Sequence, residues 1–221
     1  MNLIEGLATY ERFCGVDLTA TLSRIESSLR GATGDLAPTL ASMNATEQAI
    51  TAAGELKRIA GQVNVAIHAL GILLCLPHIL EAGEKVEYVS LGAGNTGRPF
   101  DLETDRRVAE FKFIMWKGGA ESIRQNSLFK DFVLLAESPT PKGKHIYLLE
   151  TDRPLRFLNG GRALSSVLKD ASLAKAFHSQ FGEQYQTVRD YFVPRQSYVG
   201  LHDVSAWLPG LVRIDFEDGA V

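Results

Sequence analysis

The stretch Gly97–Lys117, GRPFDLETDRRVAEFKFIMWK, decides the fold of this chain. Apolar and polar residues alternate in Arg98–Thr104 and again in Arg107–Ile114, which is the period-two pattern of strands with one apolar face. Only Asp105 and Arg106 stand between the two segments. The sequence therefore predicts a β-hairpin closed by a two-residue turn.

The length of this turn sets the register of the hairpin. A two-residue turn pairs Leu102 with Ala109, and it therefore places Asp101 opposite Glu110. Two carboxylates that face each other across a strand pair repel, so removing either charge is expected to stabilise the fold. Lys112 lies two residues further along the strand on the same face, and its positive charge would offset this repulsion. A hard divalent cation between the carboxylate oxygen atoms would offset it further. The hairpin therefore predicts a charged cluster.

The spacing of this cluster, Asp101 followed by Glu110-Phe111-Lys112, resembles the active site of the PD-(D/E)xK nuclease superfamily. The chain departs from the motif in one place, because Phe100 separates Asp101 from the preceding proline. The alternative interpretation is an exposed hairpin whose charges are only solvated.

The resemblance assigns a role to each residue of the cluster. It implies that Asp101 and Glu110 hold Mg²⁺, with Mn²⁺ as an alternative, together with the backbone carbonyl of Phe111. It implies that Lys112 orients or activates the attacking water.

The segments around the hairpin follow the order helix, strand, strand, strand, helix, strand. They are an apolar helix ending at Pro77, the strand Val86–Leu91, the two hairpin strands, the helix Ala120–Glu137 and the strand His145–Glu150. This order is similar to the αβββαβ core of the superfamily, so the resemblance covers about residues 59–150. It implies an α/β fold with a restriction-endonuclease-like mixed sheet, flanked by N- and C-terminal helices.

The two ends of the chain lie outside this resemblance. Helical spacing extends through Asn2–Arg30, and Asn44 is the expected cap of a second helix, with Glu47 three residues later as in a capping box. Residues 151–221 are expected to be mostly helical, with a last strand at Leu211–Phe216. We expect one nuclease-like domain over residues 1–221, in which residues 1–58 form a helical extension.

The composition is that of a soluble globular protein. Of its 221 residues, 45% are hydrophobic and 22% are charged, and the formal net charge of −3 excludes a generally basic nucleic-acid-binding chain. Between Arg98 and Lys130, however, seven Lys/Arg stand against five Asp/Glu. The predicted site is therefore locally positive.

The cellular location is expected to be cytoplasmic. Cys14 and Cys75 lie far apart, and the first residues lack the basic and apolar segments of a signal peptide. Ile59–Leu80 contains no Asp, Glu, Lys or Arg and is nearly long enough to span a bilayer, but its Gln, Asn, His and Pro residues argue against a membrane span.

The helix after the hairpin carries further candidate residues. Gln125 with Phe129 resembles the Gln-x-x-x-Tyr motif of RecB-like members, with Phe in place of Tyr, and the resemblance implies that Gln125 bonds a ligand or Lys112. The alternative is that Phe129 belongs to the core and its polar neighbours are solvated. The candidate phosphate contacts are Arg98, Lys117, Arg124 and Lys130.

A rival motif, G-x-G-x-x-G, stands at Gly92–Gly97. It resembles the dinucleotide fingerprint, but an alternating segment follows it where the fingerprint needs a helix. The five histidines show no zinc spacing, and no G-x-S-x-G is present.

The resemblance therefore implies a metal-dependent nuclease that acts on nucleic acid, with DNA as the expected substrate. A binding protein of the same fold without activity, and a nucleotide-binding protein that uses the glycine loop, are the alternatives. A homodimer is left open.

Overall fold

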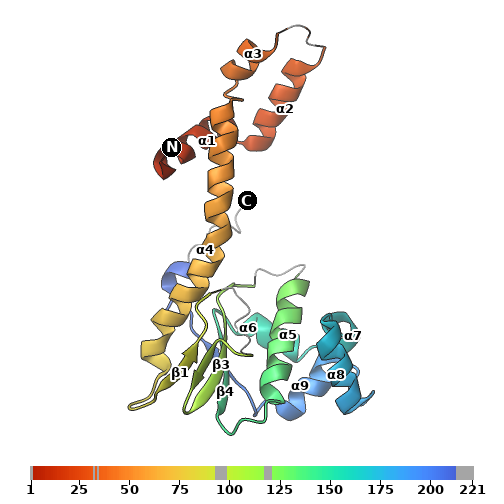
Figure 1. Ribbon diagram of the computed structural model, residues 1–221. Helices are drawn as coiled ribbons and strands as arrows, with labels where there is room; N and C mark the ends of the chain where they lie inside the picture. Colours follow the sequence, from red (N-terminus) through yellow and green to blue (C-terminus); the bar gives the residue numbers. More distant parts are fainter. Residues whose placement is uncertain (1, 32, 34, 93–98, 117–120, 213–221) are drawn as a thin grey trace. The chain divides into compact units, whose positions relative to one another are not determined.

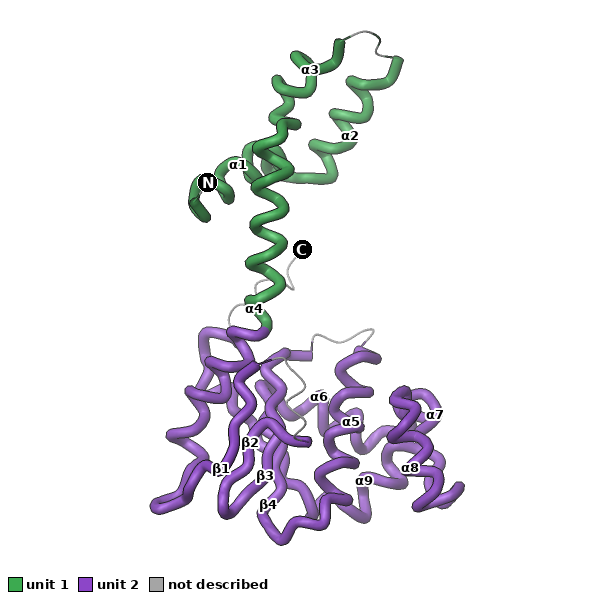
Figure 2. The backbone as a smooth tube through the Cα atoms, viewed as in Figure 1, with its two compact units in different colours: residues 1–64 green, residues 65–221 purple. Residues whose placement is uncertain are grey.

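The computed structural model describes residues 2–31, 33, 35–92, 99–116 and 121–212 (Figure 1). The chain divides into two compact units, residues 1–64 and residues 65–221 (Figure 2). The single-domain organisation stays a prediction.

The first unit is helical. It contains α1 (Leu3–Cys14), α2 (Leu18–Leu29), α3 (Ala37–Ser42) and the beginning of α4 (Glu47–Ile79). The predicted helical stretch Asn2–Arg30 is two helices, because the chain turns at Gly15 with a φ of 64°, a conformation that favours glycine.

The start of α4 differs from the prediction. Asn44 adopts a φ of 57° and its side-chain amide donates to the carbonyl of Arg12, so it does not cap the helix. The hydroxyl of Thr46 accepts from the N–H of Ala49 instead, 3.2 Å away.

The helix α4 is unusually long and apolar. It has 33 residues, and Pro77 lies within its last turn. By length and composition alone it is long and apolar enough to cross a membrane, and 17% of its most apolar 18-residue window is buried. One such helix is weak evidence for a membrane span, because the core helix of a soluble protein, which is mostly buried, passes the same test.

Five strands of the second unit form one mixed sheet in the order β1-β2-β3-β4-β5. They are β1 (Val86–Val89), β2 (Leu102–Thr104), β3 (Arg107–Lys112), β4 (Gly143–Leu148) and β5 (Gly200–Asp203). The strands β1, β2 and β3 pair antiparallel, whereas β3, β4 and β5 pair parallel. The chain is therefore a mixed α/β protein.

The hairpin has the predicted register, because Leu102 pairs with Ala109. Its turn closes without glycine: the hydroxyl of Thr104 accepts from the N–H groups of Arg106 and Arg107, at 3.0 and 2.9 Å. The strand β2 begins at Leu102, so Asp101 directly precedes the strand.

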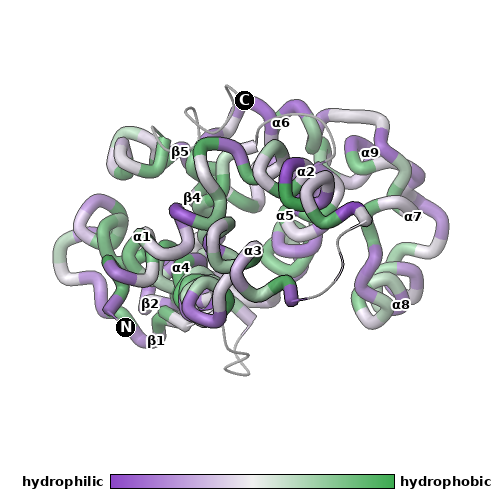
Figure 3. The backbone as a smooth tube through the Cα atoms, turned by 90° about the horizontal axis from the view of Figure 1, so that it is seen from above, coloured by the Kyte–Doolittle hydropathy of each residue, from purple (hydrophilic) through white to green (hydrophobic). Residues whose placement is uncertain are grey.

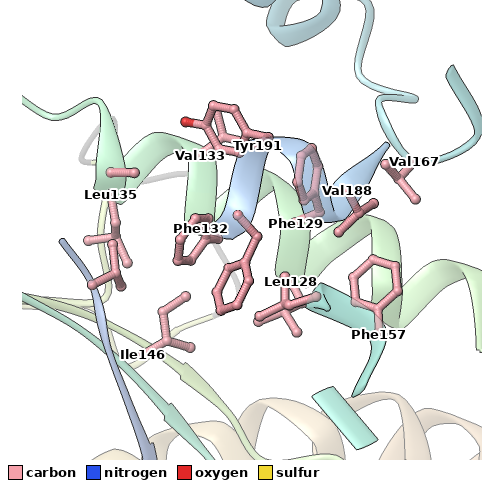
Figure 4. Close-up of a cluster of buried hydrophobic side chains, with 14 of the residues drawn as sticks. Leu128, Phe129, Phe132, Val133, Leu135, Ile146, Phe157, Val167, Val188 and Tyr191 are labelled. Carbon is pink, nitrogen blue, oxygen red and sulfur yellow. The ribbon is translucent and has the colours of Figure 1, made fainter. Parts of the chain in front are cut away.

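Each face of the sheet carries its own core. On one face, Val108, Ile146 and Leu148 pack against α5 (Ser122–Ala136), whose Phe129 is fully buried (Figure 4). On the other face, Phe111 and Tyr147 pack with residues from the last turns of α4. Residues of β4 belong to both cores: Ile146 and Leu148 to the first, and Tyr147 to the second. Figure 3 colours the backbone by hydropathy.

The C-terminal part covers the α5 side with short helices. They are α6 (Asp152–Leu158), α7 (Leu164–Val167), α8 (Ala171–Phe181) and α9 (Val188–Phe192), followed by a 3₁₀ turn at Val193–Arg195. The predicted strand Leu211–Phe216 is wrong where it is described, because Leu211 and Val212 lie in a helical turn. The rest of that segment lies outside the described residues.

Candidate active site

The charged cluster of the hairpin lies at the end of β3. Glu110 and Lys112 alternate with Phe111, which packs against α4, and Lys112 therefore points towards α5 on the other face. Asp101 comes from the chain just before β2 and is placed beside Phe111 by the hairpin register. Two strands and two helices thus determine where these side chains lie.

Asp101 is held by both of its carboxylate oxygen atoms. Oδ2 accepts from the backbone N–H of Phe111 at 3.0 Å, and Oδ1 lies 3.4 Å from Nε2 of His68 on α4. The N–H of Phe111 faces the side of β3 on which β2 pairs. Because β2 begins only at Leu102, this N–H donates to the side chain of Asp101 rather than to a strand carbonyl. Asp101 therefore links the hairpin to α4.

Lys112 is held between two carboxylates. Its Nζ lies 3.1 Å from Oε2 of Glu110 and 2.7 Å from Oδ2 of Asp131 on α5. Both carboxylate side chains are about nine-tenths buried, with 10% of Glu110 and 12% of Asp131 exposed. The ammonium therefore joins β3 to α5 in a setting with little solvent screening.

Glu110 is a buried carboxyl whose pKa is raised far above its ordinary value. Burial raises the pKa of its carboxyl to about 8, the charges of Asp131 and Asp101 act in the same direction, and Lys112 opposes them. Without a further cation, Glu110 is therefore largely protonated at neutral pH.

The partners of Asp101 and Lys112 keep both of these groups charged. Burial acts to raise the pKa of Asp101, but the hydrogen bond to His68 and the charges of His68 and Lys112 bring it below its ordinary value. Burial acts to lower the pKa of Lys112, but the charges of Asp131 and Glu110 bring it above its ordinary value. Lys112 is therefore a cation at neutral pH and not a proton acceptor.

The donor set suits a hard divalent cation. Asp101 and Glu110 could supply carboxylate oxygen and Phe111 a backbone carbonyl, which are ligand types that Mg²⁺ takes together with water. Burial is the main cause of the raised pKa of Glu110, and the charges of Asp131 and Asp101 add to it, so a cation bound beside this carboxyl would favour its ionised form. Within the described part of the chain, no group of three or more His, Cys, Asp or Glu side chains is arranged to hold a metal ion.

The predicted residues of α5 have partners elsewhere. Gln125 accepts from the guanidinium of Arg162 in the loop after α6, and Arg124 pairs with Glu121 one turn away. Lys130 pairs with Asp170 at 2.9 Å. No hydrogen bond joins Gln125 to Lys112 among the interactions that the structure describes.

Other predicted sites have mixed outcomes. Arg98, Lys117 and residues 93–97 of the glycine motif lie outside the described residues. After that motif the chain forms a bend at Pro99 and Phe100 and then enters β2, so the described residues there do not begin a helix. Phe129 is a core residue, which agrees with the alternative interpretation of the Gln125 and Phe129 pair.

Two residues of the cluster were not predicted, His68 and Asp131. A lone histidine in an apolar helix is ordinarily a core residue, and nothing in the local pattern of α5 distinguishes Asp131 from a solvated acid. Both contacts join residues far apart in sequence, so only the fold reveals them.

The carboxyl end of β4, beside the cluster, holds one more unusual acid. Glu150 accepts from the N–H of Arg153 through Oε1, whereas its Oε2 is buried without a hydrogen-bond partner in the described structure. Such an oxygen is costly to bury.

Comparisons of this chain with protein-family models, with curated proteins and with solved structures find no match. The geometry of the site is therefore the support for a function.

Proposed function

We propose that this chain is a metal-dependent phosphodiester hydrolase that cleaves nucleic acid, with DNA as its substrate. The observation that carries the proposal is the arrangement at the end of β3, where the ammonium of Lys112 lies 3.1 Å from Glu110 and the carboxylate of Asp101 accepts from the N–H of Phe111, the residue between Glu110 and Lys112. A carboxylate pair next to a fixed ammonium is suited to a site that binds a divalent cation and a phosphate together.

The topology supports the same proposal. The helix α4 precedes three antiparallel strands, and α5 then leads to β4, which is parallel to β3. This is the order of a restriction-endonuclease-like αβββαβ core, which we propose for residues 59–150. The three residues of the cluster lie on the hairpin within that core.

The chain's own residues would act as follows. Asp101, Glu110 and the carbonyl of Phe111 would hold Mg²⁺ or Mn²⁺, which when bound polarises a phosphate and lowers the pKa of a bound water. Lys112 stays protonated and donates to the attacking water or to phosphate oxygen that gains charge. Removing single donors of this kind from other enzymes lowers the rate about 10²- to 10³-fold.

Contacts within the cluster also hold its side chains in place before a substrate binds. Asp131 and Glu110 restrain the position of the Lys112 ammonium, and His68 and the N–H of Phe111 restrain Asp101. Groups that are already oriented need no reorganisation when charge develops.

Cleavage assays test the proposal. Plasmid, single-stranded DNA and RNA are incubated with the protein in Mg²⁺, Mn²⁺ or EDTA, and DNA cleavage that EDTA abolishes is expected. Asp101→Asn should abolish it, whereas Asp105→Asn, an equal change at the exposed hairpin turn, should not. Equal activity of both variants, or activity in EDTA, would contradict the proposal.

The same samples separate the alternatives. An inactive binding protein would retain nucleic acid without cleaving it in any metal. A nucleotide-binding protein would gain thermal stability with NAD or ATP and would show no dependence on Asp101.

A further inference from the structure

Some cationic side chains of the second unit are paired with a carboxylate and others are not. Arg107 and Lys112 on β3 and Arg124 and Lys130 on α5 are paired with carboxylates, whereas Lys144 on β4 donates to two backbone carbonyls. Residues 153–169, in contrast, contain four cations and no Asp or Glu, although the chain as a whole is acidic. Its cations are Arg153, Arg156, Arg162 and Lys169.

Three of these cations are exposed and have no anionic partner among the residues that the structure describes. Arg153 and Arg156 lie three residues apart on α6, so they share its outer face, while Pro154 and Phe157 face the core. Lys169 follows α7 and its Nζ donates only to the carbonyl of Ser165, at 3.1 Å. Within the described ranges, no carboxylate lies within ion-pair distance of any of the three.

The start of this segment is also close to the candidate active site. The N–H of Leu149 donates to the carbonyl of Lys112 at 3.0 Å, so β4 ends beside the cluster. Arg153 follows four residues later, a span of at most about 14 Å. That distance corresponds to about four steps along a nucleic-acid strand at about 3.4 Å per step.

A second connection runs through α5. The guanidinium of Arg162 donates to Gln125 in the second turn of α5 and to the hydroxyl of Ser166. The segment is therefore fixed to the helix whose Asp131 holds Lys112.

We propose that the exposed cations of residues 153–169 form the surface that binds the phosphate backbone of duplex DNA next to the cluster. This inference rests on the proposed function and assigns its docking surface. It replaces Arg124 and Lys130 in that role, because both are paired with carboxylates. Unpaired cations favour a polyanion through charge complementarity, and each one that meets a phosphate releases counterions.

Binding in EDTA tests this surface without requiring catalysis. The probe is a fluorescein-labelled 20-base-pair DNA duplex of random sequence, and its dissociation constant is measured by anisotropy over a range of salt concentrations. The test variant carries Arg153→Gln, Arg156→Gln and Lys169→Gln. The control variant carries Arg24→Gln, Arg30→Gln and Lys57→Gln, which remove the same charge from exposed positions of the first unit.

The test variant should bind at least about tenfold more weakly than wild type, and the slope of log K against log[salt] should fall by about 3. The control variant should bind nearly as wild type does. Equal effects of the two variants, unchanged binding by the test variant, or no binding of the duplex by wild type would overturn the proposed surface.

Cleavage in Mg²⁺, measured on the same proteins, keeps this inference separate from the proposed function. If wild type binds through these cations but does not cleave, the hydrolase proposal fails and the surface stands. If wild type cleaves and the test variant binds and cleaves equally well, the surface is wrong and the hydrolase proposal stands.

Discussion

The ammonium of Lys112 lies 2.7 Å from the carboxylate of Asp131, and this contact fastens the end of β3 to α5. A flexible lysine side chain is thereby held at one place beside Glu110 and Asp101. The neighbouring negative charges also keep the pKa of Lys112 above its ordinary value, which makes the group a permanent cation at neutral pH.

Asp131→Asn tests the role of this contact. The variant keeps the size of the side chain but removes the charge that holds Lys112, so the cleavage rate should fall about 10- to 100-fold with little change in DNA affinity. Asp131→Glu should recover part of the loss. The measurement is single-turnover cleavage together with anisotropy.

The matched control is Asp170→Asn. Asp170 pairs with the half-exposed Lys130 and caps α8, and asparagine is also a good cap. A rate loss in this variant as large as that of Asp131→Asn would show a general effect on the fold rather than positioning of Lys112.

Glu110→Gln should change how stability depends on pH. The pKa of Glu110 is raised from 4.5 to about 8, so the folded chain binds more protons than the unfolded chain between these values. The contribution of protonated Glu110 is fully present below pH 4.5 and is lost as the pH rises through about 8. Glutamine resembles the protonated form.

Thermal melts in metal-free buffer measure this effect. Glu110→Gln should melt close to wild type near pH 4.5 and clearly above it at pH 9, by a free energy on the order of a few kcal/mol. The exposed Glu55→Gln variant is the control. A constant difference from wild type at all pH values would contradict the assignment.

Asp101→Asn should have the opposite effect on stability. The mutual repulsion of Asp101 and Glu110 suggests that removal of either charge stabilises the fold. The structure revises this expectation for Asp101, whose carboxylate accepts from the N–H of Phe111 and interacts with His68. We predict a lower melting temperature at pH 7 for Asp101→Asn, and an increase would refute the revised view.

His68→Gln should shift the pH dependence of cleavage. The hydrogen bond and charge of His68 help to keep the pKa of Asp101 below its ordinary value. Without the imidazole that pKa rises, so the acidic limb of the pH–rate profile should move to higher pH. A histidine that only filled space would change the melting temperature and leave the profile in place.

The sequence predicts local features of this fold well. Alternation and turn length give the hairpin register, because both depend on residues adjacent in the chain. The strand β5 was missed since Gly200–Asp203 has only four residues and no alternating apolar pattern. The helix α6 lies in the part of the chain expected to be mostly helical, and its Pro154 stands in the first turn, where proline is tolerated.

The candidate site was predictable only in part. Asp101, Glu110 and Lys112 follow from the hairpin, but their partners do not. His68 reaches Asp101 from α4, and Asp131 reaches Lys112 from α5. Periodicity assigns such residues to a helix and a face, and the tertiary packing decides which charge each one meets.

Single-turnover cleavage of one DNA duplex by wild type, Asp101→Asn, Glu110→Gln and the double variant tests the central claim most directly. Residues that hold one cation act as a unit, so each single variant should lose nearly as much rate as the double variant, about 10³-fold or more. Glu103→Gln, on the neighbouring strand, should retain most of the wild-type rate. Two results would contradict a shared metal-dependent site at Asp101 and Glu110. In the first, the rate loss of the double variant equals the product of the losses of the two single variants; in the second, the two single variants and the double variant all still cleave.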